Sequence, residues 1–141
     1  MRQRTTGQWW RRQESAGLRL VVEGAEGALD IADFRAFRQA GFDVAQCDGP
    51  SCDGACPTQR GEPCSLVGNA DVVLTTLDAG TAVAAAVRAL HPEVPVVVEV
   101  RREPGAVVEV PPGCTALPFP TSVDGQVRVL RRAATRPDPP G

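Results

Sequence analysis

Apolar runs and helical patterns alternate along the middle of the chain. Short runs rich in Val and Leu predict buried strands over residues 18–22, 42–46, 71–76, 94–100 and 114–117. Between them, apolar side chains recur at helical spacing over residues 30–40, 81–90 and about 122–133. Strands nearly solid in Val and Leu, separated by helices, are typical of a parallel sheet with helices on both faces. We therefore expect a three-layer α/β fold with five parallel strands.

Residues at the ends of these helices agree with this interpretation. Asp30 can cap the first helix, and Gly41 can end it in the left-handed conformation. The helix over residues 81–90 ends at His91-Pro92, because proline has no amide hydrogen for a further helical hydrogen bond. The last helix is amphipathic, with Val123, Val127 and Leu130 predicted inward and Arg128, Arg131 and Arg132 predicted outward.

Length and composition indicate one domain between two unstructured ends. The chain has 141 residues, of which 43% are apolar and 23% charged, and we place the folded domain at residues 17–134. We expect residues 1–16, which are rich in Arg and contain the pair Trp9-Trp10, to be a disordered leader, and residues 135–141 to be a proline-rich tail. The net charge of −2 argues against a nucleic-acid binder over the whole domain, which leaves the Arg/Trp leader as the one candidate for such a contact.

No apolar run in the sequence is long enough for a membrane span, and the beginning lacks the pattern of a signal peptide. We therefore expect no membrane partner and a cytoplasmic location. In that compartment ordinary thiols are kept reduced.

Four of the five cysteines lie in one short segment, at Cys47, Cys52, Cys56 and Cys64. Residues 47–64 are rich in Gly and Pro, which predicts an irregular loop without a helix. Such a loop buries little surface by itself and must be ordered by something else. It leaves the carboxyl end of the second predicted strand, at the edge where open α/β sheets place their sites. We therefore predict a metal site of four thiolates, with zinc favoured.

Three other uses of the four cysteines remain open. An iron–sulfur cluster also accepts four thiolates, although the spacings match neither ferredoxin pattern. The cysteines could instead pair as disulfides, or remain reduced thiols without a ligand that respond to oxidants. The fifth cysteine, Cys114, lies on a predicted strand and is most simply a small buried apolar residue.

The order of predicted elements resembles the receiver domain of response regulators, whose flavodoxin-like sheet has the strand order 2-1-3-4-5. The resemblance covers residues 17–134 and rests on residues 71–74, Asp-Val-Val-Leu, and residues 117–123, Leu-Pro-Phe-Pro-Thr-Ser-Val. It implies the same strand order and a cis peptide bond between Phe119 and Pro120. The second and fourth helices are reduced or absent here, since residues 65–69 are too short for a full helix and residues 101–113 indicate a loop with a small extra strand.

At the catalytic positions that the resemblance implies, this chain lacks the residues that phosphorylation in the family requires. Glu23 alone stands where the family has an acidic pair for magnesium. The phospho-acceptor aspartate falls on Thr76, the switch Ser/Thr on Val100, and the lysine before Pro120 on Phe119. Without a carboxylate nucleophile and an amine to hold a phosphoryl oxygen, formation of an aspartyl-phosphate has no support.

Several weaker candidates accompany these sites. A shift of the third strand by two residues would place Asp78 at the acceptor position, but Asp78 is better placed to cap the next helix. The turn at residues 24–27 lacks the glycine spacing of a dinucleotide site. His91 is a turn residue rather than a general base. Acidic side chains that could gather at one rim and bind magnesium, or form a solvated edge, are Glu23, Glu26, Asp48, Asp78 and Glu99.

Together these features predict a non-catalytic regulatory or adaptor module that binds a protein partner. Its scaffold would be receiver-like but unable to be phosphorylated, and its cysteine loop would bind a metal or respond to redox conditions. Two alternatives stay open. One is a metal or redox sensor whose thiolates respond to oxidant, and the other is an iron–sulfur electron-transfer subunit of an oxidoreductase.

Overall fold

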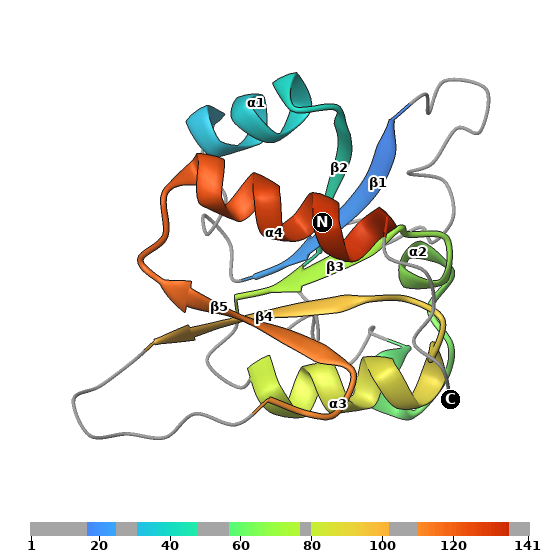
Figure 1. Ribbon diagram of the computed structural model, residues 1–141. Helices are drawn as coiled ribbons and strands as arrows, with labels where there is room; N and C mark the ends of the chain where they lie inside the picture. The colour runs from blue at the N-terminus through green and yellow to red at the C-terminus, as the bar shows by residue number, and fades with distance from the viewer. Residues whose placement is uncertain (1–16, 25–30, 48–56, 77–79, 102–109, 136–141) are drawn as a thin grey trace.

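The computed structural model describes residues 17–24, 31–47, 57–76, 80–101 and 110–135. Its sheet has five strands, all parallel, in the order β2-β1-β3-β4-β5 (Figure 1). The strands are β1 (Leu18–Glu23), β2 (Phe42–Cys47), β3 (Val72–Thr75), β4 (Val96–Arg101) and β5 (Cys114–Phe119). The helices are α1 (Ile31–Gln39), α2 (Ser65–Gly68), α3 (Gly80–Leu90) and α4 (Val123–Thr135), with a short 3-10 turn, η2 (Thr58–Arg60).

This architecture confirms the predicted three-layer α/β fold and its strand order. The second helix is reduced to the single turn α2, and residues 110–113, which lead into β5, contain no helix. The Phe119–Pro120 peptide bond is cis, as expected. Four strands extend beyond their predicted ends, β1 to Glu23, β2 to Cys47, β4 to Arg101 and β5 to Phe119. Cys47 therefore belongs to the sheet rather than to the loop that follows.

Alternating side chains of the strands divide the core into two clusters, one on each face of the sheet. Along β1, Leu20 and Val22 pack under α1 and α4, whereas Val21 faces α3 and α2. Figure 1 shows α1 and α4 on one side of the sheet and α3 on the other. Because both faces are covered, the strands at the middle of the sheet carry apolar side chains at nearly every position.

The face covered by α1 and α4 contains the aromatic side chains of the core. Leu130 of α4 is fully buried there, and the rings of Phe37 and Phe42 meet edge to face with centroids 6.4 Å apart. Gly41 ends α1 with φ of +99°, as predicted for a helix stop. A Cβ atom added to Gly17 would lie 2.1 Å from the carbonyl oxygen of Gly41, so this turn and the start of β1 pack closely.

Several predictions lie outside the described residues, among them the leader, most of the tail and the caps at Asp30 and Asp78. Residues 25–30, 48–56, 77–79 and 102–109, in the connections after β1, β2, β3 and β4, also lie outside them. Within the described part of the chain, none of the helices has the length and apolar character needed to cross a bilayer.

Candidate functional site

A row of polar side chains crosses the carboxyl end of the sheet. Glu23 of β1 is in register with Cys47 of β2 on one side and with Thr75 of β3 on the other. Neighbours in register on parallel strands point to the same face, which here is the face covered by α3. The row spans the β1–β3 boundary, where the strand order reverses. Open α/β sheets bind their ligands at this point.

Glu23 and Thr75 are buried without full hydrogen bonding. The Glu23 side chain is 1% exposed and the Thr75 side chain is fully buried. Neither Glu23 Oε1 nor Thr75 Oγ1 has a hydrogen-bond partner in the described structure. Desolvation by burial raises the pKa of Glu23 to about 7. Buried polar groups in proteins nearly always have a hydrogen-bond partner, so the two unpartnered oxygens make this end of the sheet unusual.

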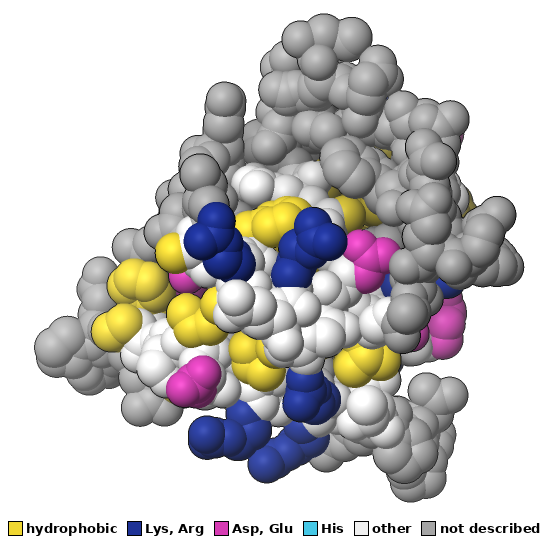
Figure 2. All heavy atoms as spheres, turned by 90° about the horizontal axis from the view of Figure 1, so that it is seen from above, with side chains coloured by type: hydrophobic (Ala, Val, Ile, Leu, Met, Phe, Trp, Pro, Cys, Tyr) yellow, Lys and Arg dark blue, Asp and Glu magenta, His cyan; other side chains and the backbone are white. Residues whose placement is uncertain are grey.

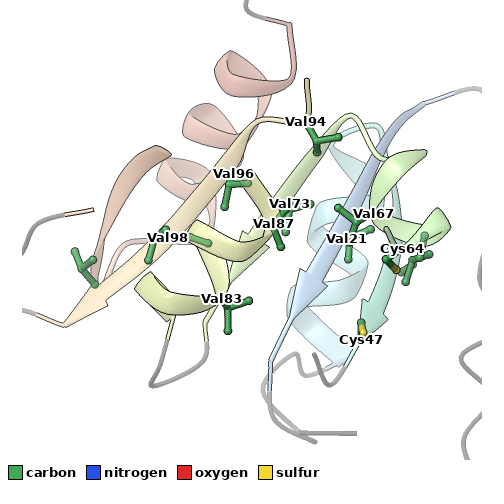
Figure 3. Packing of buried hydrophobic residues seen from close by; sticks show 14 residues of the cluster. Val21, Cys47, Cys64, Val67, Val73, Val83, Val87, Val94, Val96 and Val98 are labelled. Atoms are coloured by element: carbon green, nitrogen blue, oxygen red, sulfur yellow. The ribbon is translucent and has the colours of Figure 1, made fainter. Parts of the chain in front are cut away.

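Two of the four clustered cysteines are placed by regular structure. Cys47 is the last residue of β2, and Cys64 directly precedes α2. Both are buried thiols in the cluster beneath α3, and Figure 3 shows them on the β2 side of that cluster. Cys52 and Cys56 lie outside the described residues, so the predicted convergence of four sulfurs stays a prediction. Among the residues that are described, no three His, Cys, Asp or Glu side chains gather closely enough to hold a metal.

His91 holds Cys64 in position. The backbone N–H of Cys64 donates to Nε2 of His91 across 3.0 Å in a buried contact. Because Nε2 accepts this bond, the proton of the neutral ring is assigned to Nδ1. The ring also packs on α2, where a Cβ atom on Gly68 would lie 3.3 Å from Cε1. His91 ends α3 as predicted, and it additionally connects that helix to the cysteine segment.

The remaining receiver-like positions carry no reactive groups. Thr76 follows β3, and both its N–H and its hydroxyl donate to the carbonyl oxygen of Glu23, at 2.8 and 3.3 Å. Val100 is buried in the apolar cluster near the end of β4. Phe119 ends β5 with a side chain 44% exposed. These three positions therefore supply neither a carboxylate nucleophile nor an amine.

The predicted acidic rim is only partly described. Glu26, Asp48 and Asp78 lie outside the described residues. Glu99 is half-buried on β4, and it alternates with residues that face α3, so it points to the opposite face of the sheet from Glu23. The two described members of the rim therefore do not converge.

Cys114 is separate from the cysteine segment. It begins β5, at the amino end of the strand, and is half-buried rather than fully buried. Burial raises the pKa of its thiol, and the nearby Arg88 guanidinium acts in the opposite direction. Cys114 thus provides a matched control for substitutions in the cysteine segment.

Comparison of the chain with protein-family models, curated proteins and solved structures finds no significant match in any of the three. The resemblance to receiver domains therefore stays a prediction from the sequence.

The sequence analysis did not anticipate Thr75 or the role of His91. Thr75 is the last residue of β3 and the one polar residue of that strand, so the sequence did contain a signal for it. The acceptor role of His91 depends on a partner 27 residues earlier in the chain, and the local pattern contains no sign of it.

We predict that Glu23→Gln removes a pH-dependent loss of stability. The folded pKa of about 7 is above the ordinary value of 4.5, so the native state binds this proton more tightly than the unfolded chain does. The wild type should therefore lose stability relative to Glu23→Gln as the pH rises from about 4 to 8, by roughly 3 kcal/mol in total. Denaturant unfolding across this range measures the difference.

The exposed Glu93 provides the control for this experiment, because Glu93→Gln should leave the pH dependence of the wild type unchanged. Parallel pH profiles for the wild type and Glu23→Gln would contradict the assignment.

We predict that His91→Leu weakens the attachment of the cysteine segment. The substitution leaves the buried N–H of Cys64 without an acceptor, which costs about 1–3 kcal/mol. Hydrogen exchange at the Cys64 amide should accelerate, whereas His91→Gln, which keeps an acceptor, should be milder. Equal effects of the two substitutions would show that ring packing matters here rather than the hydrogen bond.

Proposed function

We propose that the protein is a non-catalytic regulatory or adaptor module on a receiver-like scaffold that cannot be phosphorylated. In this proposal Cys47, Cys52, Cys56 and Cys64 bind a zinc ion beside the carboxyl end of β2. The metal orders the segment between them, and the resulting surface contacts a protein partner. The proposal places the protein in the cytoplasm, where its thiols stay reduced.

One observation carries the metal part of the proposal: both ends of the cysteine segment return to the same buried cluster. The carbonyl oxygen of Cys47 accepts the N–H of Gly24 at 3.0 Å, and the N–H of Cys64 donates to His91. Two thiols are therefore held on one side of the sheet before any metal binds (Figure 3). A tetrahedral site would need Cys52 and Cys56 as well, with all four sulfurs brought to one point.

In this proposal the free energy that orders residues 47–64 comes mainly from metal binding rather than from packing within the loop. Residues 47–64 contain three glycines and three prolines, a composition that supports little regular structure. In the described part of this segment the regular structure is the last residue of β2 and the single turn η2. Coupled binding and folding at a four-thiolate zinc site contributes on the order of 10 kcal/mol, which is ample for a segment of this length.

The non-catalytic part of the proposal is supported by the side chains that stand at the receiver-like positions and by the hydrogen bond of the histidine. Thr76, Val100 and Phe119 occupy the positions where phosphoryl transfer would need a carboxylate, a hydroxyl switch and an amine. The single histidine is buried, and its Nε2 already accepts a backbone hydrogen bond. It is therefore not available as a general base in this conformation.

We predict that protein purified without air contains one zinc ion per chain. Replacing both Cys52 and Cys56 by Ser should abolish the zinc content, because two thiolates are too few for a tetrahedral structural site. Elemental analysis measures the metal, and cobalt substitution reports tetrahedral thiolate ligation by visible absorption. Hydrogen exchange should show loss of protection over residues 57–70 with the sheet preserved.

Cys114→Ser is the matched control and should keep its zinc. Visible absorption from bound iron in the purified protein would instead support the electron-transfer alternative. Zinc that is released by peroxide and regained after reduction would support the sensor alternative. Disulfides among the four cysteines, with no metal, would contradict the metal site.

We predict that small phosphodonors and beryllium fluoride leave the protein unchanged. No described group at the carboxyl edge can stabilise a bound phosphoryl group in the manner of an acceptor Asp with a Lys. Intact mass spectrometry and hydrogen exchange with and without acetyl phosphate test this expectation. A phosphoryl adduct that Asp78→Asn abolishes would identify Asp78 as an acceptor and would contradict the proposal.

A further inference from the structure

The outer faces of α1 and α4 form a basic surface. Their exposed arginines are Arg35, Arg38, Arg128, Arg131 and Arg132, which we call the arginine face. The acidic residues on these two helices are Asp33 and Asp124, each in a first helical turn, where the helix dipole favours a carboxylate. Figure 2 shows the arginine side chains on both sides of a strip in which apolar and uncharged groups predominate.

This surface is opposite in sign to the rest of the chain. The whole chain has 15 basic and 17 acidic residues. Setting aside the five arginines and two aspartates of α1 and α4 leaves ten basic and fifteen acidic residues elsewhere. Positive charge is therefore concentrated on one face of a protein that is otherwise acidic, as is typical of a surface that recognises a partner by charge.

The helix dipole favours the arginines in the last helical turns, where Arg38 and Arg132 lie, but the arginines also repel one another along each helix. Arg35 and Arg38 are three residues apart on α1, and Arg128 stands three and four residues before Arg131 and Arg132 on α4. Like charges at these spacings face one another and destabilise a helix by about 0.2–0.5 kcal/mol per pair. No arginine of this face forms an ion pair with a carboxylate in the described part of the chain. The fold itself therefore does not neutralise this charge.

Two of the five arginines have structural contacts. The guanidinium of Arg131 donates to the carbonyl oxygen of Ala40 at the end of α1, and that of Arg38 lies 5.8 Å from the centre of the Phe34 ring. Arg35, Arg128 and Arg132 have no hydrogen bond or ion pair within the described residues. These three groups are open to an external acceptor.

Apolar surface accompanies the charge. Half-buried apolar side chains on or beside these helices are Phe34, Ala40, Val123, Val127, Val129 and Ala134. Apolar groups with a cationic rim match a segment that carries both apolar and acidic side chains. The face runs along α4, which at 13 residues is about 20 Å long, the length of a short helical or extended peptide.

We propose that the arginine face of α1 and α4 is a docking surface for an acidic, partly apolar segment of a partner protein. Its carboxylates pair with Arg35, Arg128 and Arg132, and its apolar side chains lie on the strip between the helices. A short segment fits better than nucleic acid, because a long polyanion would extend over the acidic remainder of the chain. No described residue of this face offers a fully exposed aromatic ring for base stacking.

The inference specifies the partner expected under the proposed function, but it involves a different surface. The cysteine segment borders the cluster under α3, whereas the arginine face covers the opposite side of the sheet. Loss of the metal site and loss of the docking surface can therefore be distinguished by experiment.

The probe is a labelled peptide of about four helical turns with leucines on one side and glutamates on the other. We expect the wild type to bind it, and binding to weaken at high ionic strength. The triple substitution of Arg35, Arg128 and Arg132 by Gln should lower the affinity at least about tenfold. Glutamine is a good helix former, so circular dichroism should be unchanged, and the zinc content should equal that of the wild type.

Arg60→Gln removes an exposed arginine elsewhere and should leave peptide binding within about twofold of the wild type, as expected for a charge outside the binding surface. Wild-type protein that does not bind the peptide, or a triple variant that binds it equally well, would overturn the proposal. Duplex DNA that binds the same face more tightly than the peptide would also overturn it, in favour of a nucleic-acid partner.

Discussion

The structure depends on the position of β1, which lies inside the sheet between β2 and β3 and is covered by helices on both faces. Every side chain in its second half is removed from water, and Leu20, Val21 and Val22 are at most 2% exposed. This constraint requires an apolar residue at each position, whichever face it points to. Glu23 is subject to the same burial at the end of the strand, and its carboxyl group is the exception that marks the polar edge.

The two helical layers have different consequences for function. On the α1 and α4 side, complete helices close the core and leave an outer surface on which charge can vary freely. On the other side the second helix is one turn, and Leu66 and Val67 are the residues that it buries. The chain before this turn is connected to the core by a hydrogen bond from Cys64 to His91 and by contact of η2 with α3, where Thr58 is buried. The second helix is thus reduced to one turn, and the segment before it is the one that the proposal has ordered by a bound metal.

The strands and long helices were predictable because their signals are local. A strand buried on both faces is a continuous Val and Leu run, and a helix on a sheet repeats its apolar residues at helical spacing. The strand ends at Glu23 and Cys47 were missed because burial there comes from neighbouring strands. The contact of the Asp71 carboxylate with the N–H of Arg19, at 2.7 Å, joins residues 52 apart and has no local pattern. The cysteine pattern indicates a metal, but sequence spacing cannot fix how four sulfurs meet.

The sheet also determines how the two proposed surfaces relate. Cys47 and Cys64, at the two ends of the cysteine segment, lie on the opposite side of the sheet from the arginine face, and each face of the sheet has its own buried side chains. Perturbations at sites that share no partner residues are generally additive, because a rigid core has one arrangement rather than two. Metal binding would therefore order its own segment without changing the affinity of the arginine face. Coupling between the metal site and the arginine face would require β1 to adopt a second arrangement. The burial of β1 on both faces opposes such a change.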